Sequence, residues 1–138
     1  MTTAREIMTP NAECVNAGQT IADAAAKMRG LDVGSLPICG EDNRLKGMIT
    51  DRDIVVKVIA QGKDPKSCLA GELGGDEVVT IGADDDAREI LHTMGSHKIR
   101  RLPVIDDHTL VGMVALADVA KALPDTPVGE LMDALTTD

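Results

Sequence analysis

The strongest constraint on the fold of this chain is an internal repeat. The stretch "LPICGEDNRLKGMITDRDIV" (36–55) matches "LPVIDDHTLVGMVALADVA" (102–120), with their Leu-Pro pairs 66 residues apart. The same offset holds back through most of each half, and it falls to 65 after a turn that is one residue longer in the first copy. A match that keeps its register in this way predicts one folding unit used twice, as repeats at 1–66 and 67–138.

Each repeat has the same predicted order of elements. A short extended piece comes before a helix, in which Ile21, Ala24 and Met28 recur at helical spacing. Two strands then form a hairpin around a polar turn, and a second helix ends the unit. The fold class is therefore α/β, with two β-α-β-β-α repeats. The extended pieces are predicted at 12–16 and 77–81, the hairpins at 35–39 with 45–50 and 101–105 with 110–115, and the second helices at 51–61 and 116–123.

Composition excludes several classes of partner. The chain of 138 residues has a net charge of −9, which argues against nucleic acid and against an anionic membrane surface. It has no Phe, Tyr or Trp, so a planar ligand would be held by aliphatic side chains and backbone. It has no apolar run long enough to span a bilayer and no apolar signal core at its start. We therefore expect a cytoplasmic protein.

The predicted helix 51–61 has more apolar surface than one sheet needs. Ile54, Val55, Val58 and Ile59 are expected to form one apolar stripe, and Val56 with Ala60 belongs to a second. One stripe would cover the sheet, and the other would face water in a monomer. An extra apolar face is typical of a partner surface, so we expect a homodimer through helices 51–61 and 116–123. The alternative is that the two repeats of one chain already cover it.

These motifs resemble a known family. The combination "Leu-Pro-apolar" followed by "Gly-apolar-apolar-Thr-x-x-Asp" occurs in both halves, with Ala in place of Thr in the second. With "IMTPNAECVNAGQTIADAAAKM" before it, nearly the whole chain resembles a tandem pair of CBS domains, or Bateman module, and is similar to small stand-alone CBS-pair proteins of bacteria, including those induced in hypoxia. The resemblance implies repeats packed about a pseudo-twofold axis, with clefts between them that in many relatives bind AMP, ADP, ATP or S-adenosylmethionine.

The resemblance also assigns residues. The family's ribose-binding Asp falls on Asp53 and its phosphate-binding Thr falls on Thr50, whereas in the second copy Asp118 matches but Ala115 replaces the Thr. A purely structural interpretation stays open, because Thr-x-x-Asp at a helix start is also a capping box. A capping role and a ligand role are compatible, since a helix start offers unpaired N–H groups to a phosphate.

One basic cluster stands out in this acidic chain. The segment "SHKIRR" (96–101) places Arg100 and Arg101 just before "Leu-Pro", where the family can contact phosphate. Arginine forks match phosphate geometry. The alternative is a solvated loop paired with acidic residues such as those at 84–86. The first copy has the uncharged "VGS" at this position, so a phosphate preference would differ between the repeats.

The remaining reactive residues give a second hypothesis. Cys14 and Cys39 lie on segments that a CBS-like unit brings near one another. The spacing of the three cysteines, including Cys68, and of the histidines matches no metal-ligand pattern. No nucleophile–base pair predicts an enzyme. We therefore expect a non-catalytic regulatory or sensor module that binds an adenosine-type nucleotide. The alternative is a structural or protein-interaction CBS pair that has lost nucleotide binding, with a redox or metal role for Cys14 and Cys39.

Overall fold

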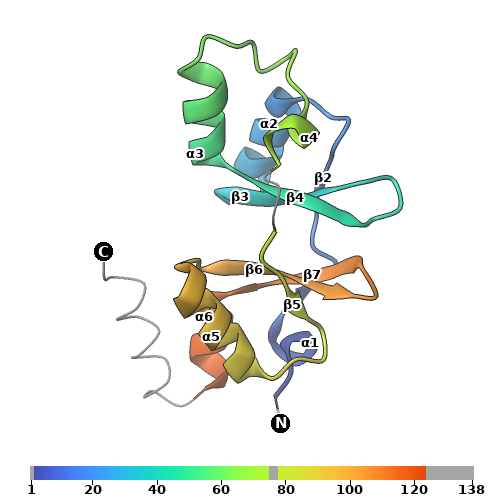
Figure 1. Ribbon diagram of the computed structural model, residues 1–138, viewed down its shortest axis with the longest axis vertical. Helices are drawn as coiled ribbons and strands as arrows, with labels where there is room; N and C mark the ends of the chain where they lie inside the picture. The colour runs from blue at the N-terminus through green and yellow to red at the C-terminus, as the bar shows by residue number, and fades with distance from the viewer. Residues whose placement is uncertain (1, 75–77, 124–138) are drawn as a thin grey trace. The chain divides into compact units, whose positions relative to one another are not determined.

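The chain folds into two compact units of mixed α/β structure (Figure 1). The computed structural model describes residues 2–74 and 78–123. The first-repeat unit comprises Glu13–Val78, and the second-repeat unit combines Met1–Ala12 with Val79–Asp138. The compact units therefore differ from the sequence repeats, because the N-terminal segment of the chain packs with the second half.

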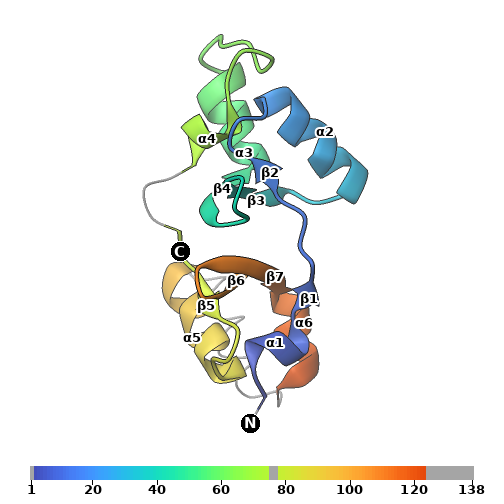
Figure 2. The ribbon, with the colours of Figure 1, turned by 90° about the vertical axis from the view of Figure 1, so that its right-hand side faces the viewer.

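The first-repeat unit is a three-stranded sheet with helices on one face (Figure 2). Its strand order is β2-β3-β4, with β2 parallel to β3 and β3 antiparallel to β4. The core contains Ile21, Ile38, Ile49 and Val58, which are all almost completely buried. The elements are β2 (Val15–Asn16), α2 (Ile21–Leu31), β3 (Ser35–Cys39), β4 (Leu45–Thr50), α3 (Asp51–Asp53), the π-helix η1 (Ile54–Ile59) and α4 (Ala70–Leu73).

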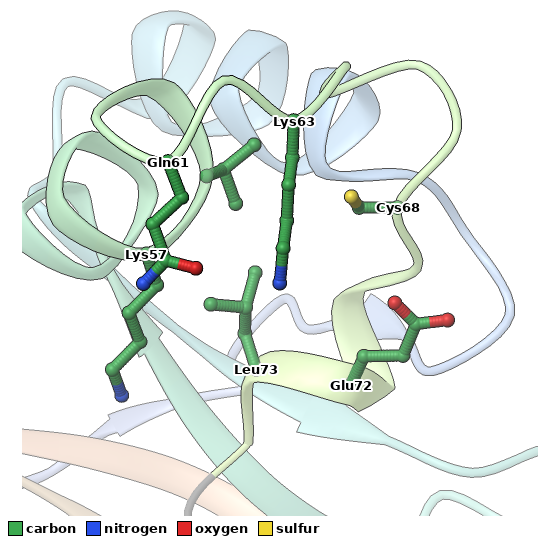
Figure 3. A pocket seen from close by; sticks show the side chains of 7 residues that line it. Lys57, Gln61, Lys63, Cys68, Glu72 and Leu73 are labelled. Atoms are coloured by element: carbon green, nitrogen blue, oxygen red, sulfur yellow. The ribbon is translucent and has the colours of Figure 1, made fainter.

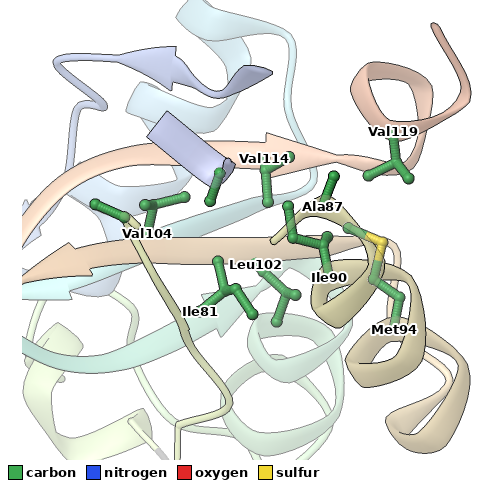
Figure 4. Close-up of a cluster of buried hydrophobic side chains, with 10 residues drawn as sticks. Ile81, Ala87, Ile90, Met94, Leu102, Val104, Val114 and Val119 are labelled. Atoms are coloured by element: carbon green, nitrogen blue, oxygen red, sulfur yellow. The ribbon is translucent and has the colours of Figure 1, made fainter. Parts of the chain in front are cut away.

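The second-repeat unit has a four-stranded sheet of order β1-β7-β6-β5. Its first strand, β1, comes from the N-terminal segment and pairs antiparallel with β7. Side chains of α5 and of the central strands meet in its core, among them Ile90, Leu102 and Val114 (Figure 4). The elements are α1 (Ala4–Ile7), β1 (Thr9–Pro10), β5 (Ile81–Gly82), α5 (Ala87–His97), β6 (Arg101–Asp106), β7 (Thr109–Ala115) and α6 (Leu116–Ala122).

The structure confirms the predicted α/β class and both hairpins. Strands β3 and β4 begin and end at the predicted residues, and β6 and β7 each extend one residue further into their turn. Both hairpins also have a register shift at the equivalent position, at Ile38/Cys39 and at Val104/Ile105. The extended pieces are shorter than predicted, and part of the one at 77–81 lies outside the described residues.

The predicted helix 51–61 differs in its winding. A single α-turn, α3, continues into η1, where the N–H of Ala60 donates to the carbonyl of Val55, five residues back. The predicted stripe is also wrong in detail. Val58 is buried and Ile54 is half-buried, whereas Val55 and Ile59 are 57% and 55% exposed. The apolar face that remains exposed consists of Val55, Val56 and Ile59.

No helix in the described part of the chain is both long enough and apolar enough to cross a membrane.

Candidate functional site

Thr50 and Asp53 meet where β4 ends and α3 begins. The backbone N–H of Asp53 donates to Thr50 Oγ1 at 3.0 Å, and the backbone N–H of Thr50 donates to Asp53 Oδ2 at 3.1 Å. This is a complete capping box. Thr20 and Asp23 form the same box at the start of α2, so the geometry by itself is that of a cap.

The Asp53 carboxylate has a second contact that sequence reasoning missed. Its Oδ1 lies 3.3 Å from Lys57 Nζ, one helical turn further on, and the Asp53 side chain is 25% exposed. The spacing of four residues between opposite charges was the signal that could have predicted this pair. Because each carboxylate oxygen can accept more than one hydrogen bond, Oδ1 remains able to accept from a hydroxyl group.

The second-repeat unit keeps half of this arrangement. The backbone N–H of Ala115 donates to Asp118 Oδ2 at 2.8 Å, at the start of α6. Alanine has no hydroxyl group to return the bond, so the reciprocal half of the box is missing. Within the described ranges, Asp118 has no ion-pair partner, and its other oxygen is available to a ligand.

Arg101 lies at the same end of the second-repeat unit as Asp118. It opens β6 directly opposite Ala115 of β7, and the neighbouring Arg100 accepts the N–H of Leu116 at its carbonyl. Both arginine side chains are exposed. The hairpin register therefore brings Arg101 to the first turn of α6. The equivalent position opposite Thr50 holds Ser35.

The alternative pairing of Arg100 and Arg101 with residues 84–86 is not found among the described residues. Asp84 instead lies 3.5 Å from Arg5, and the carboxylate of Asp86 accepts the N–H of Arg88 as the cap of α5. Arg100 and Arg101 have no ion-pair partner in this part of the chain. Their contact with phosphate stays a prediction.

Cys14 and Cys39 come together in the first-repeat unit, and all three cysteines are free thiols. Cys39 ends β3 and is only 2% exposed, while Cys14 precedes β2, the parallel neighbour of β3. Burial, followed by hydrogen bonding with the Cys14 side chain, raises the pKa of the Cys39 thiol to about 12. The predicted proximity of the two cysteines is therefore confirmed.

This raised pKa predicts slow alkylation of Cys39. At about pH 8, we expect iodoacetamide to modify Cys39 roughly a thousandfold more slowly than a thiol of ordinary pKa, because that much less thiolate is present. The unfolded chain would lose this proton near pH 9 and the folded chain near pH 12, so the stability of the fold decreases across that window. Mass spectrometry of timed reactions gives the rates, and equal rates for Cys39 and Cys68 would contradict the assignment.

The described residues contain no group of three or more His, Cys, Asp or Glu side chains placed to hold a metal ion. His97 Nδ1 lies 3.1 Å from the Thr93 carbonyl on its own helix.

The architecture and the two Asp-bearing helix starts define a class of protein. A family model described as "CBS domain" matches residues 4–60 and 70–125. The chain therefore belongs to the CBS-domain family and carries two copies of the domain, as the sequence motifs predicted.

Individual relatives match the chain over most of its length. It is 47% identical over 135 residues to Hypoxic response protein 1 of Mycobacterium tuberculosis, covering 98% of this chain and 94% of that protein. It is 38% identical over 120 residues to the CBS domain-containing protein YhcV of Bacillus subtilis, covering 87% and 84%.

Two solved structures illustrate what such folds hold. A crystal structure of Hypoxic Response Protein I with two coordinated zinc ions has a TM-score of 0.83 and 49% identity, covering 89% of this chain and all of that one. The crystal structure of CBSX2 in complex with AMP has a TM-score of 0.76 and 24% identity, covering 88% and 96%. At 24% identity, the likeness to CBSX2 shows a shared fold.

Proposed function

We propose that this chain is a non-catalytic regulatory module that binds an adenosine-type nucleotide, such as AMP, ADP, ATP or S-adenosylmethionine. The observation that carries the proposal is the pair of carboxylates, Asp53 and Asp118, at equivalent helix starts. In each, a backbone N–H fixes one oxygen. Asp118 keeps this position although Ala115 removes the reciprocal cap, which favours a role beyond capping.

The proposed contacts follow from the groups present. Asp53 accepts the hydroxyl groups of the ribose at Oδ1, where Lys57 now lies at 3.3 Å. Thr50 donates its hydroxyl hydrogen to a phosphate, because its oxygen already accepts the Asp53 N–H. In the second-repeat unit, Asp118 takes the ribose and Arg101, with Arg100, takes the phosphate. The AMP complex of CBSX2 supports the ligand class.

Removing the Asp53 carboxylate tests the proposal. Asp53→Ala loses a charge-assisted hydrogen bond to the ribose, so we expect AMP affinity to fall at least about tenfold by titration calorimetry. The same substitution also removes half of a capping box, which costs about 0.5–2 kcal/mol of stability. The heat of binding must therefore be measured well below the melting temperature.

The chain offers a matched control for the capping cost. Asp23→Ala breaks the identical box of α2 and should destabilise the fold by a similar amount while leaving AMP affinity unchanged. If Asp53→Ala binds AMP as the unmodified chain does, Asp53 is only a cap. If no variant and no unmodified chain binds any of the four ligands at millimolar concentration, the nucleotide proposal is wrong.

The exposed apolar face of η1 supports a homodimer. Val55, Val56 and Ile59 form a contiguous patch that a second copy of the chain would cover. The predicted partner helix, α6, contributes no large exposed hydrophobic residue within its described length, so the main contact is proposed at η1. A monomer mass in light scattering would contradict this. Three free thiols fit a reducing cytoplasmic compartment, which we also propose.

The contact between Cys14 and Cys39 favours a second candidate function, a redox role in a CBS pair that binds no nucleotide. The two thiols interact, but the high pKa of Cys39 keeps it protonated at neutral pH, where the thiolate is the reactive form. A disulfide between them in protein purified without reductant, together with no heat on nucleotide titration, would favour this function over the first.

A further inference from the structure

The first-repeat unit contains a cavity away from the Thr50–Asp53 box, between the end of η1 and α4 (Figure 3). Its volume is about 360 Å³, within the range of about 300–1,000 Å³ typical of small-molecule sites. One wall carries Gln61 and Lys63, and the opposite wall carries Cys68 and Glu72. The proposed nucleotide contacts use none of these four residues.

Backbone hydrogen bonds hold both walls in place. On the first wall, the N–H of Lys63 donates to the carbonyl of Val58 at 2.9 Å, which continues the five-residue bonding of η1. On the second, the N–H of Ile21 donates to the carbonyl of Cys68 at 2.9 Å, and the N–H of Ala70 donates to that of Gln19 at 2.8 Å. These hydrogen bonds fix the linker between η1 and α4 at both walls, so the cavity is preformed.

The cavity has an apolar floor and opposite charges at its rim. Val58 is 1% exposed and Leu73 is half-buried, and both line it. The side chain of Lys63 extends across the cavity, whereas Glu72 lies on the far side (Figure 3). Within residues 2–74 and 78–123, neither Lys63 nor Glu72 has an ion-pair partner. Lys57 also lines the cavity, but Asp53 already holds its ammonium group.

From this arrangement we propose that the cavity binds a free α-amino acid with an aliphatic side chain. The carboxylate of the amino acid pairs with the Lys63 ammonium and accepts from the Gln61 amide. Its ammonium group pairs with Glu72. The aliphatic side chain packs on the half-buried Leu73, beside the buried Val58. One unpaired cation and one unpaired anion match a zwitterion better than a simple anion, which Glu72 would repel.

Methyl resonances provide a direct test, because Val58 and Leu73 form the floor. The full-length chain, without nucleotide, is titrated with L-valine, L-leucine and L-methionine in turn while ¹H–¹³C methyl spectra are recorded. We expect saturable shifts at these two residues. We also expect 4-methylpentanoate and 3-methylbutylamine, which each lack one charge of leucine, to bind at least about tenfold more weakly.

Three variants complete the experiment. Lys63→Met and Glu72→Gln should each weaken binding at least about tenfold, whereas Lys66→Met, an exposed residue of the same linker outside the cavity, should leave it unchanged. Saturable shifts that neither Lys63→Met nor Glu72→Gln weakens would overturn the proposal, as would the absence of saturable shifts with all three amino acids. Because the titration contains no nucleotide, its result is independent of AMP binding.

Discussion

Replacing Gly112 by alanine is expected to lower the free energy of unfolding of the second-repeat unit by about 1–3 kcal/mol. An added Cβ at this position would lie 2.7 Å from the carbonyl oxygen of Thr9 and 2.5 Å from Met8 Sδ. The methionine side chain can move aside, but the Thr9 carbonyl belongs to the backbone of β1. The strand β1 must therefore move away from β7, which weakens its pairing.

A second glycine provides the matched control. Gly30 lies near the end of α2, and nothing lies within 4 Å of a Cβ added there. Gly30→Ala should therefore stabilise the chain, by roughly 0.5–1 kcal/mol, because alanine loses less backbone entropy in a helix. Since the chain has no aromatic residues, far-ultraviolet circular dichroism in urea is the appropriate measurement. A Gly112→Ala variant as stable as the unmodified chain would show that β1 does not press on β7.

The repeat explains why glycine occurs at this position in both halves. Gly47 and Gly112 are single glycines in the hairpin strands, which is typical of close backbone approach, and the structure shows such an approach at both positions. At Gly112 the neighbours are Met8 and Thr9, and at Gly47 the neighbour is the Cα of Gly74, 3.0 Å from an added Cβ. Residues 8 and 74 are equivalent in the two copies, so each copy supplies the segment that covers the other copy's strand.

This exchange of segments was not predictable from the repeat. A repeat shows which residues are equivalent, but it does not show which copy a segment packs against. The hairpins were predictable because each consists of neighbouring strands joined by a polar turn, so local pattern was enough. The π-helical winding of η1 was not predictable, because the same apolar residues fit an α-helix and a π-helix. The sequence placed Val55 and Val58 in one apolar stripe, whereas the structure buries Val58 and exposes Val55.

The candidate site also has parts that could be predicted from the sequence and parts that could not. The Thr50–Asp53 box follows from a local motif, and the place of Arg101 follows from hairpin register. The pairing of Asp53 with Lys57 was missed, although its spacing was visible. The cavity beside α4 could not be predicted from the sequence. Its walls come from segments that a linker separates, and no local pattern determines the path of that linker.

Deletion of residues 1–12 should unfold the second-repeat unit and leave the first-repeat unit folded. The N-terminal segment contributes β1 to one sheet and places Ala4, which is fully buried, in the core of that unit. The N–H of Ala4 donates to the carbonyl of Asp85 at 2.9 Å, and that of Arg5 donates to Ala83 at 2.8 Å. Without the segment, these carbonyls and the edge of β7 lose their partners, and the core is opened to water.

Amide hydrogen exchange separates the two units by residue. In the deletion variant, we expect protection to be lost at Val104 and Val114 and kept at Ile38 and Ile49, which are all fully buried in the intact chain. Arg5→Gln is the control: it removes the exposed ion pairs with Asp84 and Asp106 but keeps the backbone contacts, so protection should remain in both units.

Either of two results would contradict the expectation that the segment supports the second-repeat unit alone. Protection kept at Val114 would mean that residues 79–123 hold their fold unaided. Protection lost equally at Ile38 would mean that the two units unfold together. Selective loss of protection in the second-repeat unit would mean that the fold around Asp118 and Arg101 requires the N-terminal segment. Any change that releases this segment would then remove the proposed nucleotide contacts of Asp118 and Arg101 while leaving Thr50 and Asp53 in place.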